Sequence, residues 1–306
     1  MNQIRSDLAV EICRHVTRNK FQGDGIEYTE ATCGSMPLET IKVISPKGEE
    51  LLGKPMGCYQ TLNTGKLWLE DRSCFQEKVM GLRDLFLSVF RETVSKKSLI
   101  LVVGLGNERI TADAIGPVAV RNLIVTRHIR QEKPLIFQEL GLSEVCALTP
   151  GVLGQTGMES ADIVKSVTEH IKPDLVIAID ALASRDPERL VTTIQICDSG
   201  ICPGAGIGNR RSALTPKTLN VPIISIGVPT VVDAATLASD AVFRFSGQKE
   251  TAETIRNEWS KSKLNFFVTP KETDQIIRVM GSFIGYGINL ALNEDMSFED
   301  MLSLIG

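Results

Sequence analysis

The chain has 306 residues, of which 43% are hydrophobic, and this is enough to bury the core of one large domain. Its formal net charge is −4 and its Lys and Arg residues do not gather into a stripe, so the composition excludes a nucleic-acid-binding surface. No apolar run approaches the roughly 20 residues that cross a bilayer, the N-terminus lacks the apolar segment of a secretory signal, and the seven cysteines fit no metal-binding spacing, so we expect a cytoplasmic protein with free thiols and no membrane contact.

The N-terminal part differs in pattern from the rest of the chain. Residues 1–68 are rich in turns and contain short alternating stretches such as 39–45, which predicts a small β-rich addition. From about residue 71 to 95 apolar side chains recur every three or four positions, so an amphipathic helix is expected to pack one stripe on the core. Residues 69–306 are expected to form the main α/β domain.

Three continuous apolar runs predict the strands of that domain. They lie at 99–105, 175–179 and 221–227. Runs without polar alternation are typical of strands that are buried on both faces of a parallel sheet.

Helices are predicted between these runs and after them. The first is expected to begin at Gly116-Pro117 and to continue to about residue 126, because proline is favoured in the first turn. Capping boxes at 156–159 and 269–272 are expected to open two more helices. The last helix contains Gly281-x-x-x-Gly285, which we interpret as a site of close helix packing.

The polar and charged stretch 244–265 is expected to be an exposed excursion from the domain. The alternation of strands and helices predicts an α/β fold of three layers, α/β/α. Its central sheet is expected to be mostly parallel, with the β-rich segment added at the N-terminus.

Two aspartates follow two of the apolar runs. Asp113 comes after the run at 99–105 and a short turn, and Asp180 comes directly after the run at 175–179. An open parallel sheet binds ligands at the carboxyl ends of its strands, and a right-handed crossover makes these two strands neighbours. The pair is therefore predicted to share one pocket, as a water-activating dyad or as metal ligands. Taken singly, each carboxylate could instead cap the helix or turn that follows it.

The turn after the first run begins like a dinucleotide-binding fingerprint. It reads Gly104-Leu-Gly106, but Arg109 stands where the third glycine belongs. We therefore expect no dinucleotide cofactor. Gly106 and Asn107 are instead predicted to line a pocket beside Asp113, with turn amides as oxyanion donors.

A second motif, Asp198-Ser-Gly200, matches the signature of pepsin-like and retroviral aspartic proteases. Those enzymes are all-β and need two such loops, so a single copy in an α/β chain is interpreted as a turn. The glycine-rich loop at 198–211 ends in Asn209 and Arg210. These two residues are candidates for clamping a substrate backbone or carboxylate, or the loop simply crosses the surface.

Long segments in a fixed order then give the chain a family resemblance. It resembles the germination protease of spore-forming bacteria, the endopeptidase that degrades small acid-soluble spore proteins. The segments that carry the resemblance are RSDLAVE (5–11), VVGLGN (102–107), TADAIGP (111–117), PGVLGQTG (150–157), IAIDALA (177–183), QICDSGI (195–201), GIGNR (206–210), IGVPTVVDA (226–234) and NFFVTPKE (265–272).

The resemblance implies a catalytic pair, a substrate and an assembly. The family's two proposed catalytic aspartates fall on Asp113 and Asp180. Its fold is similar to that of the hydrogenase-maturation endopeptidases, and its members assemble as homotetramers that act on small acid-soluble spore proteins in the forespore and spore core. No cofactor is implied.

The resemblance also implies a zymogen that processes itself. The family enzyme removes a short N-terminal segment, and the corresponding bond here is Asp7–Leu8 in Arg-Ser-Asp-Leu-Ala. The pro-segment before Leu8 is shorter than in familiar relatives, and the excursion at 244–265 is compact where relatives carry a long insertion.

Two other functions stay open at this point. One is a metal-assisted maturation-type protease that uses Asp113 and Asp180 as metal ligands. No histidine follows Asp180 in the sequence, and two carboxylates alone suit Mg²⁺ or Ca²⁺ better than nickel or zinc. The other is a non-catalytic module that binds a small ligand or nucleotide at the turn 104–107.

Overall fold

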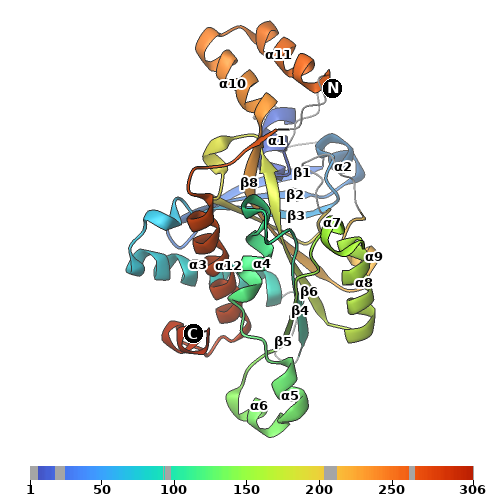
Figure 1. Cartoon of the computed structure of the whole chain (residues 1–306), viewed down its shortest axis with the longest axis vertical. Coiled ribbons are helices and arrows are strands. Elements are labelled where there is room, and N and C mark those ends of the chain that lie inside the picture. The colour runs from blue at the N-terminus through green and yellow to red at the C-terminus, as the bar shows by residue number, and fades with distance from the viewer. Residues whose placement is uncertain are drawn as a thin grey trace.

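In the computed structural model, which describes residues 6–17, 25–91, 93, 98–202, 212–261 and 266–305, a nine-stranded sheet forms the middle of the molecule (Figure 1). The strand order is β1-β2-β3-β7-β8-β6-β4-β5, and β9 pairs with β8. The strands are β1 (Ile26–Cys33), β2 (Met36–Val43), β3 (Gly57–Asn63), β4 (Leu99–Gly104), β5 (Glu144–Leu148), β6 (Leu175–Ser184), β7 (Thr193–Cys197), β8 (Ile223–Asp233) and β9 (Phe267–Val268).

Helices connect and cover these strands. The α-helices are α1 (Ala9–Thr17), α2 (Pro46–Leu52), α3 (Arg72–Arg91), α4 (Ile115–Arg121), α5 (Arg127–Glu132), α6 (Pro134–Leu140), α7 (Leu153–Thr156), α8 (Ser160–Ile171), α9 (Pro216–Leu219), α10 (Ala234–Ser246), α11 (Lys249–Lys261), α12 (Thr273–Leu292) and α13 (Phe298–Ile305). The 3₁₀ turns are η1 (Leu67–Leu69), η2 (Thr111–Asp113) and η3 (Pro187–Arg189).

The sheet has a parallel half and an antiparallel half. Strands β8, β6, β4 and β5 run parallel, and β8, β6 and β4 overlap the predicted apolar runs. Strands β1, β2, β3 and β7 extend the sheet in antiparallel order. The β-rich segment within residues 1–68 therefore joins the same sheet through the pairing of β3 with β7. The predicted α/β class is confirmed, and the parallel arrangement is limited to four strands.

Helices cover both faces of the sheet (Figure 1). Helices α3, α4 and α12 pack on one face, where Phe86 and Phe283 are fully buried. Helices α8 and α9, together with α1 and α2, cover the opposite face. Successive side chains of β6 alternate between these faces, since Ile177 belongs to the first cluster and Val176 to a cluster on the other side. The predicted three-layer arrangement is confirmed.

Helices α4 and α12 approach each other closely at two glycines. A Cβ at Gly281 would lie 2.5 Å from Val118 Cγ1, and one at Gly285 would lie 2.9 Å from Ala119 O. The interpretation of these glycines as a site of close helix packing is therefore confirmed.

The predicted helix starts are less accurate. Helix α8 begins after Glu159 without a side-chain cap, because Thr156 ends the short helix α7 instead. Helix α12 begins after Glu272, whose φ of +64° places it in a turn, and it too lacks a side-chain cap. Both predicted capping boxes are therefore wrong. In each case a residue of the predicted box belongs to the helix or turn that precedes the new helix, so it does not cap that helix.

Other predicted boundaries also change. Helix α4 ends at Arg121 rather than near residue 126, because the Asn289 side chain of α12 accepts from Ile124 N and donates to Asn122 O. Strands β6 and β8 extend beyond the predicted runs because they continue to pair with each other as far as Ser184 and Val232, past the end of β4.

Of the excursion expected at 244–265, residues 244–261 are described, and they lie in the helices α10 and α11 and the turn between them. The two helices pair as a hairpin beyond the end of β8 (Figure 1). The side chain of Phe245 on this hairpin is 93% exposed. Among the described helices, none combines the length and apolarity that a membrane crossing requires.

Candidate active site

Asp180 lies where strand β6 loses its neighbour β4. The last pair between these strands is Gly104 with Ile179, and Asp180 is the next residue of β6. It is buried, and its Oδ1 accepts a hydrogen bond of 2.9 Å from Ala181 N. The prediction that Asp180 ends its strand is wrong, because β6 continues beside β8. Asp180 nevertheless lies at the carboxyl edge of β4.

Asp113 is the last residue of η2, and it folds back on the turn after β4. Asn107 N donates both to Asp113 Oδ2, at 2.8 Å, and to Asp113 O, at 3.0 Å. Gly106 has a φ of +113°, and a Cβ there would overlap the carbonyl oxygen of Asp113. Only glycine fits this position without strain. The structure thus places Gly106 and Asn107 beside Asp113, while the N-cap of α4 is Ala114.

The segments that carry the two aspartates are joined by their backbones. Leu105 N donates to Ile179 O at 2.8 Å, directly before Asp180. A Cβ at Gly116 would lie 2.6 Å from the same oxygen, so the start of α4 also lies against β6. Thr230 Oγ1 of β8 donates to Ala112 O at 2.6 Å, which binds η2 to the neighbouring strand. The turn after β4, the start of α4 and β6 therefore meet at one edge of the sheet.

The N-terminal segment lies along the same end of β6. Asp7 N donates to Ala183 O at 2.8 Å, and Ala183 N donates to Asp7 Oδ2 at 2.9 Å. Leu8 is fully buried, in one cluster with Leu182 of β6. The Asp7–Leu8 bond, which the family resemblance marks for processing, is thus held against the strand that carries Asp180.

A glutamine that was not predicted from the sequence, Gln195, also binds the N-terminal segment. Gln195 of β7 donates through Nε2 to Asp7 O at 3.3 Å and accepts from Ala9 N through Oε1 at 2.7 Å. It is buried, at 7% exposure. A long polar side chain in an otherwise apolar buried strand was the signal that could have found it, since such a group needs a hydrogen-bond partner.

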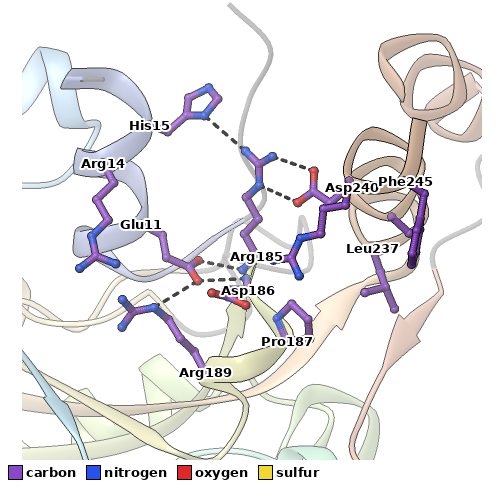
Figure 2. A pocket seen from close by; sticks show the side chains of 12 residues that line it. Glu11, Arg14, His15, Arg185, Asp186, Pro187, Arg189, Leu237, Asp240 and Phe245 are labelled. Atoms are coloured by element: carbon purple, nitrogen blue, oxygen red, sulfur yellow. Dashed lines mark hydrogen bonds and ion pairs between the residues drawn. The ribbon is translucent and has the colours of Figure 1, made fainter. Parts of the chain in front are cut away.

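Glu11 of α1 gives the N-terminal segment a second attachment to the end of β6, about one helical turn after Asp7. Its carboxylate accepts from Ser6 Oγ, from Ser184 Oγ at 2.8 Å, from Arg185 N at 2.8 Å and from Asp186 N at 3.0 Å. Glu11 lines a hollow of about 520 Å³. Figure 2 shows its carboxylate and, in the same hollow, Arg185 bound to Asp240 of α10. Helix α1 is therefore bound directly to the end of β6.

Asp7 provides a prediction about pH. Burial raises the pKa of Asp7, against smaller effects of Lys54 and of the Ala183 amide, which lower it. Docking of this segment is therefore fully favoured below the ordinary aspartate pKa of about 3.9 and weakens as the pH rises through the raised value. We expect the amide protons of residues 8–10 to be better protected from exchange at pH 4 than at pH 7.

The measurement uses the Asp180→Asn background, so that the segment stays in place. The matched control is Asp7→Asn, whose Oδ1 still accepts from Ala183 N but which does not titrate. Its protection is expected to be independent of pH over this range. Identical pH profiles for the two proteins would contradict the assignment to Asp7.

Beside Asp7 and Gln195 the structure contains a hollow of about 220 Å³, which is also lined by Lys54, Tyr59 and Gly227. Gly227 is the direct partner of Asp180 in the sheet. The hollow therefore adjoins the strand row that contains Asp180, and it offers room beside the peptide unit of Asp7.

The remaining candidates lie elsewhere. Asp198-Ser-Gly200 forms the turn after β7, where Asp198 Oδ1 accepts from Cys58 N at 2.8 Å and Ser199 Oγ donates to Tyr59 Oη at 2.8 Å. Asn209 and Arg210 lie outside the described residues. Within the described ranges, no group of three or more His, Cys, Asp and Glu side chains is placed to hold a metal ion.

Comparison with known proteins gives consistent matches over nearly the whole chain. A family model described as germination protease matches residues 5–252. The chain is 40% identical to the germination protease of Caldanaerobacter subterraneus subsp. tengcongensis, over 99% of this chain and 98% of the relative. It is 37% identical to that of Clostridium acetobutylicum, over 98% of both chains. The germination protease of Bacillus subtilis is 39% identical, over 97% of this chain and 95% of the relative.

Among solved structures, a NiFe hydrogenase maturation protease from Thermococcus kodakarensis KOD1 is similar to part of the chain. The match covers 56% of this chain and 97% of that one, with 19% sequence identity and a TM-score of 0.32.

Proposed function

The chain belongs to the germination protease family, and from this premise we propose that it is an endopeptidase that degrades small acid-soluble spore proteins during spore germination, with Asp113 and Asp180 as its catalytic pair. One observation carries the proposal. The backbone bond from Leu105 N to Ile179 O fastens the turn that holds Asp113 to the residue before Asp180.

The proposed chemistry follows from two carboxylates in one site. Such a pair does not ionise fully without a cost, so it shares a proton. The ionised partner takes a proton from water as the water attacks the peptide carbonyl, and the protonated partner donates to the developing oxyanion and then assists the leaving amine. The Asn107 amide donates to Asp113, so it is not available to the oxyanion. The donor to the oxyanion is therefore expected to come from another strand.

We extend the proposal to a zymogen that cleaves its own Asp7–Leu8 bond. The contacts of Asp7 with Ala183 and Gln195 support this, because they hold that bond beside the strand of Asp180. In keeping with the family resemblance, the active form is proposed to be a homotetramer in the spore core.

The test is to digest a purified small acid-soluble spore protein with the purified chain, with and without a chelator. We expect internal cleavage that the chelator does not change, and N-terminal sequencing of the enzyme afterwards is expected to begin at Leu8. Loss of cleavage with the chelator would favour the metal-assisted protease, with Asp113 and Asp180 as ligands. Absence of cleavage together with nucleotide binding would favour a non-catalytic module at the turn 104–107.

A further inference from the structure

Gln195 holds the peptide units on both sides of Leu8. Its Nε2 donates to the carbonyl oxygen of Asp7, and its Oε1 accepts from the amide of Ala9. The second bond fixes the orientation of the first, because the Ala9 amide can only donate and must face Oε1. The NH₂ group of Gln195 is therefore directed at the carbonyl of the Asp7–Leu8 bond.

The sheet places Gln195 in the same cross-strand row as Asp180. Gln195 pairs with Gly227, and Gly227 pairs with Asp180 on its other side. Residues paired in this way present their side chains on the same face of a sheet. Because neighbouring strands lie about 4.8 Å apart, the Cα atoms of Gln195 and Asp180 are roughly 10 Å apart. Gly227, which lies between them in the row, has no side chain of its own.

Leu182 and Lys54 surround the rest of the segment. A Cβ at Gly227 would overlap Leu182 Cδ1, so Leu182 covers this glycine, and it packs in one cluster with Leu8. Asp7 accepts from the Ala183 amide and lines the same hollow as Lys54. Asp7, Leu8 and Ala9 thus each contact the face of the sheet that β6, β8 and β7 form.

We propose that Gln195 is a catalytic residue, which binds the carbonyl oxygen of the bond that is cut, both in the chain's own segment and in substrates that present an acidic residue followed by Leu and Ala. This inference rests on the proposed endopeptidase function. Water adds to the carbonyl carbon of the acidic residue and gives up a proton to the aspartate pair. The carbonyl oxygen becomes an oxyanion that accepts from Gln195 Nε2. The C–N bond then breaks, the leaving nitrogen takes a proton from the pair, and a carboxylate and an amine result.

The test measures cleavage of a synthetic peptide that corresponds to residues 2–13 of the chain. Gln195→Glu keeps the acceptor for the Ala9 amide but loses the donor when ionised. We expect kcat to fall about 10²-fold, the effect of removing one oxyanion donor, with a smaller change in KM. The ratio of variant to wild-type kcat is expected to recover as the pH falls, because a protonated glutamic acid donates again.

Two further variants keep the test decisive. Gln195→Met has a similar length without a donor or a charge, and it is expected to lose kcat equally at all pH values, even if Gln195→Glu does not fold. Gln60→Glu is the matched control, because Gln60 lies on β3 and pairs with Ile196, so its side chain is on the opposite face from Gln195. It is expected to cleave as the wild type does.

The outcomes separate this inference from the proposed function. If the wild type cleaves the peptide and Asp180→Asn does not, the proposed function stands. Wild-type kcat in Gln195→Met under those conditions would overturn the role of Gln195. If the wild type does not cleave, or if Asp180→Asn cleaves equally well, the proposed function itself fails.

Discussion

Replacement of Asp180 or Asp113 by asparagine is expected to lower kcat for peptide cleavage by about 10³-fold, within the range for loss of a general acid or base. Asparagine cannot take a proton from water or share one with a partner carboxylate. It does keep the local structure, since its Oδ1 can still accept from Ala181 N at position 180 and from Asn107 N at position 113. The loss is therefore expected in kcat, with an unchanged free energy of unfolding.

Asp233→Asn is the matched control for these two variants. Asp233 is buried at the end of β8, the strand next to β6, and its Oδ2 accepts from Thr236 N as the N-cap of α10. Asparagine caps helices as well as aspartate does, so cleavage at the wild-type rate is expected. If Asp113→Asn and Asp180→Asn each cleave near the wild-type rate, the catalytic pair is wrong. If only one of them loses activity, a single carboxylate acts and the shared proton is wrong.

Gly106→Ala is expected to have the second large effect, on both folding and activity. The φ of +113° is unfavourable for alanine, and its Cβ would overlap the backbone oxygen of Asp113, which cannot move without shifting η2. We expect a loss of at least about 3 kcal/mol in the free energy of unfolding, more than the 1–2 kcal/mol that a left-handed residue costs alone. The measurement is urea-induced unfolding, followed by cleavage assays on the folded fraction.

Gly141→Ala is the control for Gly106→Ala, because it places alanine at a positive φ without a steric overlap of its Cβ. Gly141 has a φ of +63° at the end of α6, and a Cβ there would have nothing within 4 Å. Its replacement is expected to cost only the left-handed penalty of about 1–2 kcal/mol and to leave cleavage intact. Equal losses in the two variants would show that the contact of Gly106 with Asp113 has no energetic role.

The sequence predicted those parts of the fold that depend on local pattern. The apolar runs identified β4, β6 and β8, because strands buried on both faces need apolar side chains at every position. Their ends were not predictable in the same way. Strand β6 continues to Ser184 because β8 continues beside it, and a helix or strand boundary of this kind depends on the partner rather than on the local residues.

The candidate site was predictable in part, for a topological reason. Asp113 follows β4, and Asp180 lies in the neighbouring parallel strand β6 directly after its last pair with β4. The rule for open sheets therefore brings their segments to one edge. The contact of Gln195 with residues 7–9 has no such rule behind it. It joins residues that are 186 positions apart, through an antiparallel half of the sheet that hydrophobic periodicity alone did not place.

The end of β6 is held at two points by one short stretch of chain. Asp7 binds Ala183 through two hydrogen bonds, and Glu11 binds residues 184–186. A cut between Asp7 and Leu8 would leave Asp7 in a released peptide and Glu11 in the remaining enzyme. The released peptide would then be held by the contacts of Asp7 and by the hydrogen bonds of Ser6 Oγ with Glu11 and Leu8 N. Its departure would vacate the edge of β6 beside Asp180 while α1 stayed bound. If the proposed processing takes place, a covalently attached segment would give way to a free substrate at this edge, and the positions of β6 and α1 would not need to change.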